Sequence, residues 1–274
     1  FGIATNNIMW VALGNNQNSN ISATYTIAYS YDGINWRGAN NNPFSTVDTD
    51  TYGLDVAWNG SRWVAIGHGD AFSIAYSDDG INWTGALAAT TATSHMKSIS
   101  WNGSLWIAVG GNGLANSEFQ MKYSSDGITW TSSNNSIRAQ LPPTGNKVAW
   151  NSAHIGHVTI NHPIVAACED ITLNNSGSSL AYSNNDGLSW RGLGNTVFKG
   201  DASGNCIAWN GNVWVAGALF SNGVEHTLAY SYDGLQWTGL GKTLFSNAVN
   251  DVAWNGERWL AIGSSTGGSG STTI

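Results

Sequence analysis

Carboxylate and imidazole side chains that could do chemistry lie in variable segments of this 274-residue chain, between stretches that repeat. Three of the four glutamates fall in successive segments of this kind. Carboxylates around one opening could bind a hydroxylated ligand or a cation, or supply the acid/base pair of glycoside cleavage. Carboxylates in surface loops are also common simply as solvated groups. The candidate ligand-binding set is His68, Asp70, Glu118, Glu169, Asp170, Glu225 and His226.

Two other stretches hold some of the ligands of a metal site. Residues 48–53 read Asp-x-Asp-x-Tyr-Gly, which begins like a calcium loop but lacks the third oxygen ligand and the distal glutamate. His154, His157 and His162 could ligate zinc, but their spacing matches no known site, and a polar surface loop accounts for them more simply. The sequence therefore predicts no cofactor and no metal site. Calcium is the one ion considered as an alternative.

A repeat of 47 residues organises the chain that carries these groups. Residues 28–36 read AYSYDGINW, with Asp32 before the glycine. This aspartate motif returns four times, and its aspartates stand 47, 47, 60 and 47 residues apart. Self-similarity at a fixed period is typical of repeat architectures.

A second motif, Trp-Asn-Gly-x-x-Trp, alternates with the aspartate motif. It stands at residues 58–63, 101–106, 209–214 and 254–259, with a degenerate copy at 5–10 and a disrupted copy that begins at Trp150. All 15 tryptophans belong to one of the two motifs, which favours packing between repeats as their role. A sugar pocket repeated in every copy could still use one of the three tryptophan sets.

Each repeat reads as four short strands, expected in the second copy at 56–58, 63–66, 73–77 and 81–84. Asn-Gly and Asp-Gly between apolar runs predict tight hairpins. The run from Trp63 to Ile66 is apolar throughout, so that strand must be buried on both faces, as it is in four-stranded sheets stacked around an axis. The sequence predicts an all-β, single-domain β-propeller of six four-stranded blades, the last lacking its outer strand. The expected blades are 1–38, 39–85, 86–132, 133–192, 193–239 and 240–274.

The motif aspartates have a structural interpretation, because a turn aspartate accepts hydrogen bonds from the next backbone N–H groups. Five copies of one catalytic acid would make no chemical sense. The turns that hold them and the Asn-Gly turns should share one face, so the opposite face carries the variable loops, where binding residues are expected. The predicted structural turn residues are Asp32, Asp79, Asp126, Asp186 and Asp233.

The pattern Ser-x-Asp-Gly-x-x-Trp resembles the Asp-box, or BNR, repeat of sialidase-like propellers. The usual Asp-box has one more residue between Asp and Gly, and only the fourth copy has that length, with Asn185 in the aspartate place. The whole repeat is similar to uncharacterised propellers of large DNA viruses and some bacteria. The resemblance implies the fold, and it implies that the aspartate motifs lie away from any active site.

The resemblance does not extend to sialidase chemistry. Sialidases clamp a carboxylate with three arginines, whereas four of the five arginines here, Arg37, Arg62, Arg191 and Arg258, are repeat residues or lie in Asn-Gly turns. Only Arg138 is outside the repeat pattern, and no Tyr/Glu nucleophile pair can be placed.

Composition excludes several classes of protein. Charged residues make up 10% of the chain and the net charge is −7, so a phosphate-binding surface for nucleic acid is not expected. No apolar run reaches the roughly 18 residues of a membrane span. Cys168 and Cys206 are too few for a disulfide scaffold. Scarce Cys, low Lys content and 32 asparagines suggest an extracellular or virus-particle surface setting.

Three functions follow from these observations. The first is a non-enzymatic recognition module for a glycan or other cell-surface ligand, because amide- and hydroxyl-rich loops suit hydroxylated ligands. The second is a structural or surface protein of the virion type, in which the open sheet edge at 271–274 pairs with a neighbouring chain. The third is a glycoside hydrolase, which carboxylate placement alone supports.

Overall fold

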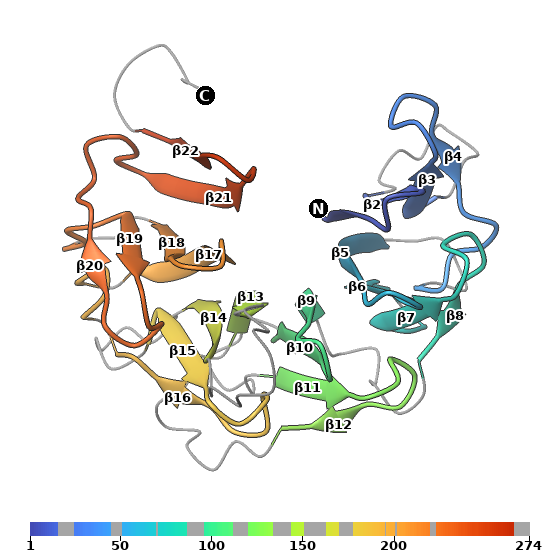
Figure 1. The fold of residues 1–274 in the computed structure, drawn as a ribbon, viewed down its shortest axis with the longest axis horizontal. Helices are drawn as coiled ribbons and strands as arrows, with labels where there is room; N and C mark the ends of the chain where they lie inside the picture. The colour runs from blue at the N-terminus through green and yellow to red at the C-terminus, as the bar shows by residue number, and fades with distance from the viewer. Residues whose placement is uncertain are drawn as a thin grey trace. The chain divides into compact units, whose positions relative to one another are not determined.

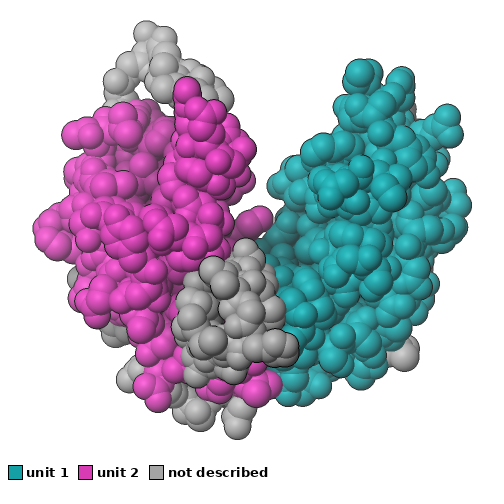
Figure 2. Space-filling view, viewed as in Figure 1, with its two compact units in different colours: residues 1–112, 120–132 teal, residues 113–119, 133–274 magenta. Residues whose placement is uncertain are grey.

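Strands and turns make up the described part of the chain. The computed structural model describes residues 1–15, 25–44, 51–69, 71–86, 96–111, 120–133, 144–150, 163–169, 178–194, 196–200, 202–219 and 223–265. No helix occurs in these ranges, and so none that could span a membrane. The chain forms two compact units, Phe1–Asn112 with Gln120–Ser132, and Gly113–Phe119 with Ser133–Ile274 (Figure 2).

The first unit holds three four-stranded antiparallel sheets, each with its strands in chain order (Figure 1). Blade 1 comprises β1 (Ile3–Thr5), β2 (Trp10–Leu13), β3 (Ile27–Ser30) and β4 (Arg37–Gly38). Blade 2 comprises β5 (Tyr52–Trp58), β6 (Trp63–His68), β7 (Ile74–Ser77) and β8 (Thr84–Gly85). Blade 3 comprises β9 (Met96–Trp101), β10 (Trp106–Gly110), β11 (Gln120–Ser124) and β12 (Thr131–Ser132).

The second unit holds two more sheets of this type and a hairpin. Blade 4 comprises β13 (Thr144–Trp150), β14 (Ile164–Glu169), β15 (Leu180–Ser183) and β16 (Arg191–Gly192). Blade 5 comprises β17 (Ser203–Trp209), β18 (Trp214–Leu219), β19 (Leu228–Ser231) and β20 (Thr238–Gly239). The hairpin pairs β21 (Ala248–Trp254) with β22 (Trp259–Ser264), and it meets β18 through the single pair Leu219–Ala248.

The structure therefore has five blades of four strands, and the prediction of six is wrong. The sixth repeat supplies only its first two strands among the described residues, because its expected third strand, at 271–274, lies outside them. The all-β class and the four-strand unit are confirmed.

The Asn-Gly turns close the first hairpin of a blade as predicted. The Asn59 Oδ1 atom accepts hydrogen bonds from the backbone N–H groups of Ser61 (2.9 Å) and Arg62 (2.7 Å). Gly60 has φ of 103°, a left-handed conformation that suits glycine. In the degenerate first copy Asn7 takes that place with φ of 68°, since asparagine also tolerates this region.

In blades 2 and 3 the second strand is buried on both faces, which confirms the interpretation of its continuous apolar run. In β6 the side chains of Trp63, Val64, Ala65 and Ile66 are all fully buried. Trp63 and Ala65 pack with residues of blade 1, and Val64 and Ile66 pack with residues of blade 3. Blades within the first unit therefore stack face to face through their second strands.

The tryptophans between neighbouring blades are buried, but those of the first blade are not. Trp63 has 0% exposure and Trp83 has 4%, whereas their blade 1 counterparts Trp10 and Trp36 have 40% and 39%. The reason is local, because in the first unit no sheet precedes blade 1. The prediction that the indoles are packing residues therefore holds for Trp63 and Trp83 and fails for Trp10 and Trp36.

A buried carboxylate joins blade 2 to blade 3. Asp55 follows a bulge in β5 and is 8% exposed. Its Oδ2 atom accepts hydrogen bonds from Ser98 Oγ (2.8 Å) and from the Ile99 backbone N–H (3.2 Å) on β9. The second unit makes the corresponding link with amides, because Asn146 donates to the Gly204 carbonyl and Asn205 to the Val249 carbonyl, each at 2.9 Å.

We expect Asp55→Ala to lower the free energy of unfolding by about 2 kcal/mol, because it leaves a buried N–H and hydroxyl without their acceptor. Asp251→Ala is the matched control. Asp251 is exposed, and like Asp55 it accepts the N–H of the next residue, at 3.0 Å. Urea unfolding of both variants measures the difference, and equal losses would show that the link between blades contributes nothing.

Candidate functional site

The antiparallel order of each blade separates two faces. The turn face of each unit carries the first-to-second and third-to-fourth strand turns, such as residues 59–62 and 78–83. The loop face carries the second-to-third strand loops and the links between blades. Alternate connections of a meander emerge at opposite edges, so the predicted division into faces follows from the observed strand order.

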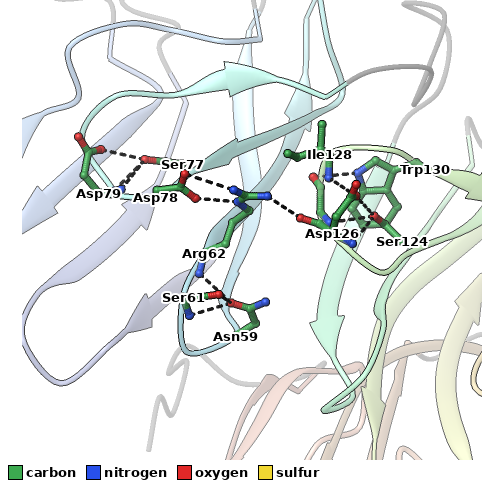
Figure 3. Close-up of polar contacts among 12 residues, drawn as sticks. Asn59, Ser61, Arg62, Ser77, Asp78, Asp79, Ser124, Asp126, Ile128 and Trp130 are labelled. Carbon is green, nitrogen blue, oxygen red and sulfur yellow. Dashed lines mark hydrogen bonds and ion pairs between the residues drawn. The ribbon is translucent and has the colours of Figure 1, made fainter.

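The aspartate turn is a closed network of hydrogen bonds (Figure 3). Ser77 Oγ donates to Asp79 Oδ1 at 2.9 Å and accepts the Gly80 N–H at 2.8 Å. The same carboxylate oxygen accepts the N–H groups of Ile81 and Asn82, each at 2.8 Å. The Asn82 amide donates to the other oxygen, Oδ2, at 2.7 Å. The aspartate acts as the acceptor that holds the turn, and Asn82 also joins the turn to the link between blades 1 and 2, because its Oδ1 atom accepts a hydrogen bond from the Asn40 amide at 2.8 Å.

The serine and backbone bonds of this network recur around Asp32, Asp126 and Asp233, and the amide bond to Oδ2 recurs at Asp32, from Asn35. The fourth copy differs, because Asn185 rather than Asp186 accepts the Ser183 hydroxyl (2.9 Å) and the Ser189 N–H (2.9 Å). Asp186 is the additional residue of this longer turn, with φ of 58°. Asn185 therefore takes the turn role expected of Asp186.

Hydrogen bonds hold the turn carboxylates in their charged form. At Asp32 the backbone N–H of Asn35, followed by the Asn35 amide, lowers the pKa well below 3.8. At Asp79, burial opposes the shift, but the bonds from Asn82, Ile81 and Ser77 outweigh it and lower the pKa to about 2. Acids with such low pKa values are poor proton donors near neutral pH.

An arginine on the turn face links blades 2 and 3 (Figure 3). Arg62 Nε and Nη2 contact the two oxygens of Asp78 at 2.7 and 3.2 Å, and Nη1 donates to the Asp126 carbonyl at 2.8 Å. The guanidinium also lies 5.1 Å from the centre of the Tyr76 ring. The hydrogen bond with Asp78 raises the pKa of Arg62. Arg62 is thus a positioning residue, as its place in a repeated turn indicated.

On the loop face, Glu225 forms an ion pair. Its Oε2 atom lies 2.6 Å from Lys199 Nζ in the link between blades 4 and 5, and both side chains are largely exposed. The hydrogen bond and the charge of Lys199 lower the pKa of Glu225. A surface pair of this kind stabilises little, but it orients two loops.

His226 occupies the repeat position that holds Tyr25 in blade 1 and Phe72 in blade 2. A methyl group added at Gly239 would overlap the His226 ring, just as one at Gly38 would overlap Tyr25 and one at Gly85 would overlap Phe72. His226 Nδ1 also accepts the Gly241 N–H at 3.0 Å. The imidazole is therefore part of the repeat, and the aromatic residues at the same position were the signal for this in the sequence.

His68 ends β6 and lies against Tyr52, with ring centroids 5.0 Å apart. A polar network supports the neighbouring loops, because Thr26 Oγ1 donates to Asn42 Oδ1 at 2.9 Å and the Asn42 amide contacts Thr51 Oγ1 at 3.4 Å. His68 belongs to the first unit, whereas Glu225 and His226 are adjacent residues of the second.

The other candidates lie outside the described structure. Asp70, Glu118 and Asp170 fall between the described ranges, as do His154, His157 and His162, and Glu169 is described only as the last residue of the β14 backbone. Within the described residues, the only members of the predicted set that lie side by side are Glu225 and His226, which are neighbours in sequence. Among the described residues no three Cys, His, Asp or Glu side chains form a metal-binding group.

No protein-family profile and no curated protein sequence matches the chain. Solved structures do match. The GH74 xyloglucanase from Xanthomonas campestris superposes with a TM-score of 0.55 at 14% identity, over 88% of this chain and 32% of the enzyme. The fold is that of a β-propeller.

Two further propellers match at similar identity. An ancestral GH74 enzyme gives a TM-score of 0.54 at 15% identity, over 78% of this chain and 28% of its own. YCF48 bound to D1 peptide gives 0.51 at 15%, over 81% and 64%. This chain thus spans less than two thirds of each of these proteins, and such identity shows the propeller fold alone. The likeness to Asp-box and viral propellers stays a prediction.

We expect Asp79→Asn to lower the free energy of unfolding at neutral pH by about 1 kcal/mol, because its new amide would face the Asn82 amide that now donates to Oδ2. The pKa of Asp79 is depressed in the folded state, so its contribution is complete above about pH 4 and is lost as pH falls through about 2. Denaturant unfolding at several pH values should show the gap to wild type closing with acid.

Asp126→Asn is the control for this prediction. At that turn the residue in the Asn82 place is Thr129, whose backbone N–H bonds Oδ1 at 2.8 Å, so no side-chain amide would be opposed. Asp126→Asn should therefore lower the free energy of unfolding by less than Asp79→Asn does. A gap for Asp79→Asn that does not change with pH would contradict the electrostatic explanation.

Proposed function

We propose that this propeller is a non-enzymatic recognition module that binds glycans through its loop face. The observation that carries the proposal is that described loop-face side chains are fixed by hydrogen bonds, Asn42 by Thr26 and Thr51, and Glu225 by Lys199. In glycoside cleavage the general acid is a carboxyl with a raised pKa, and Glu225, whose pKa is lowered by the hydrogen bond and charge of Lys199, does not fit that role. Beside it, His226 accepts a backbone hydrogen bond. These groups hold the loops in place, and a ligand that binds ordered loops loses less free energy to ordering them.

The chemistry of the loop face favours a hydroxylated ligand. In the described part between blades 1 and 2, Asn42 is half-buried, and hydrogen bonds with the buried hydroxyls of Thr26 and Thr51 fix its side chain beneath the loop face. Groups that donate and accept in fixed positions suit sugar hydroxyls. The matched propellers include a xyloglucanase, while YCF48 was solved with a peptide, so a peptide is the competing ligand class.

The proposal predicts binding to neutral glycans, measured on a glycan array and then by calorimetry with the best ligand. His68→Ala and Asn42→Ala should each weaken that binding about fivefold or more, through the loss of one or two polar contacts. Ser61→Ala, on the turn face, is the control for a change remote from the loops. Binding that survives both loop substitutions would place the site elsewhere, and a folded protein that binds no glycan would reject the function.

A second candidate function is assembly into a larger particle, with an extracellular or particle-surface location. It is favoured by the apolar residues that the β21–β22 hairpin presents to solvent, since Leu260 and Ile262 are 53% and 43% exposed. Their counterparts in β6, Val64 and Ile66, are fully buried against the next blade. The edge at 271–274, proposed to pair with a neighbouring chain, lies outside the described residues.

If Leu260 and Ile262 pack against a neighbouring protein chain, the wild-type protein should form oligomers at micromolar concentration. The double variant Leu260→Asp, Ile262→Asp should be monomeric. Light scattering coupled to size-exclusion chromatography measures both masses. Leu244→Asp is the control, because Leu244 is 74% exposed and lies outside the strands. A monomeric wild type would count against assembly.

A further inference from the structure

The same pair of tyrosines occurs on the turn face of two blades. In blade 1, the rings of Tyr29 and Tyr31 meet edge to face with centroids 6.0 Å apart and an interplanar angle of 83°. In blade 5, Tyr230 and Tyr232 repeat this geometry at 5.8 Å and 86°. The outer rings are largely in solvent, with Tyr31 at 61% and Tyr232 at 66% exposure.

In blade 2 an arginine covers the tyrosine at the equivalent position. Tyr76 is the counterpart of Tyr29, and the Arg62 guanidinium covers it at 5.1 Å. Asp78 stands in the place of Tyr31 and fixes that arginine through two contacts (Figure 3). Blade 1 has Met9 in the place of Arg62, and blade 5 has Val213. Neither residue can form this pair, so an exposed ring stands where blade 2 has an ion pair.

The exposed rings stand on rigid backbone. Tyr31 immediately precedes Asp32, whose carboxylate accepts the N–H groups of Ile34 (2.8 Å) and Asn35 (2.7 Å). Tyr232 immediately precedes Asp233, which makes the same two bonds at 2.8 and 2.7 Å. A ring held in place before binding loses little conformational freedom when a ligand stacks on it.

The ligand class follows from the groups around the rings. The face of a phenol ring carries negative charge density and attracts the polarised C–H groups of a pyranose, while its hydroxyl can bond a sugar hydroxyl. Polar side chains lie across the ladder, because Arg37 pairs with Tyr29 and Thr238 with Tyr230. The net charge of −7 disfavours polyanions.

We propose that Tyr31 and Tyr232 are two stacking subsites for the pyranose rings of neutral glycans, on the face opposite the loops. The proposal rests on the proposed function for its ligand class and adds a second location to it. Each unit carries one subsite, so the loss of a single ring leaves the other available and the test must change both.

The test is affinity electrophoresis in gels that contain xyloglucan, galactomannan or arabinan, with heparin as the polyanionic comparison. Relative to wild type, Tyr31→Ala with Tyr232→Ala should weaken binding to the retarding neutral polysaccharide about tenfold. The Tyr31→Trp, Tyr232→Trp variant should retain it, because an indole offers the same stacking face. Ile34→Ala is the control, since Ile34 lies in the same turn as Tyr31 and is 81% exposed but offers no ring on which a sugar can stack.

The outcomes separate the two proposals. If wild type is retarded and the double alanine variant is retarded equally, the subsites are rejected while glycan recognition stands. If folded wild type is retarded by none of the three neutral polysaccharides, the subsites and the proposed function are both rejected. Thermal unfolding midpoints within about 2 °C of wild type would exclude loss of fold as the cause of weakened binding.

Discussion

A strand that is apolar on both faces is fully buried only where a sheet covers each face, and this requirement organises both units. In blade 2, Trp63 and Ala65 face one neighbour while Val64 and Ile66 face the other, and all four are fully buried. In the second unit Val165 and Ala167 pack in one cluster with Trp214 and Ala216 of the following blade. Each blade depends on its neighbours for its core, so the blades cannot fold as independent domains.

Hydrogen bonds fix the register between neighbouring blades that stack through apolar side chains. Apolar contact alone would let one sheet slide along the next, but Asp55 reaches Ser98 and Ile99 across one junction, and Asn205 reaches the Val249 carbonyl across another. At the turn face Arg62 bonds the Asp126 carbonyl across the same junction as Asp55. Buried or half-buried polar groups with fixed partners thus specify how blades align, while the indoles and aliphatic side chains supply most of the burial energy.

Local features of the fold could be predicted from the sequence, and features that depend on a neighbour could not. The Asn-Gly hairpins, the aspartate turns and the buried second strand are set by adjacent residues or by periodicity. Asp55 was missed because a carboxylate inside a strand gives no local signal, and its partners lie 43 and 44 residues away. The exposure of Trp10 was missed for the same reason, since its sequence motif is that of its buried counterparts. His226 was interpreted as a ligand because Gly239, which makes room for its ring, lies on another strand, and its place in the repeat is signalled only by Tyr25 and Phe72 at the same position.

The aspartate turn leaves one position open to change. The hydrogen bonds of the turn join the serine two residues before the aspartate, the aspartate itself and the N–H groups that follow it. The side chain of the residue between the serine and the aspartate forms none of these bonds. That position holds Tyr31, Asp78, Ser125 and Tyr232 in the four short copies. Since the turn has the same form with each of them, the side chain at this point can be chosen for what it meets beyond the turn. In blade 2 it fixes an arginine between blades, and in blades 1 and 5 it places an aromatic ring in solvent on backbone that is already rigid. A repeated structural motif can in this way carry different surface chemistry in different blades while the hydrogen bonds of the turn stay the same.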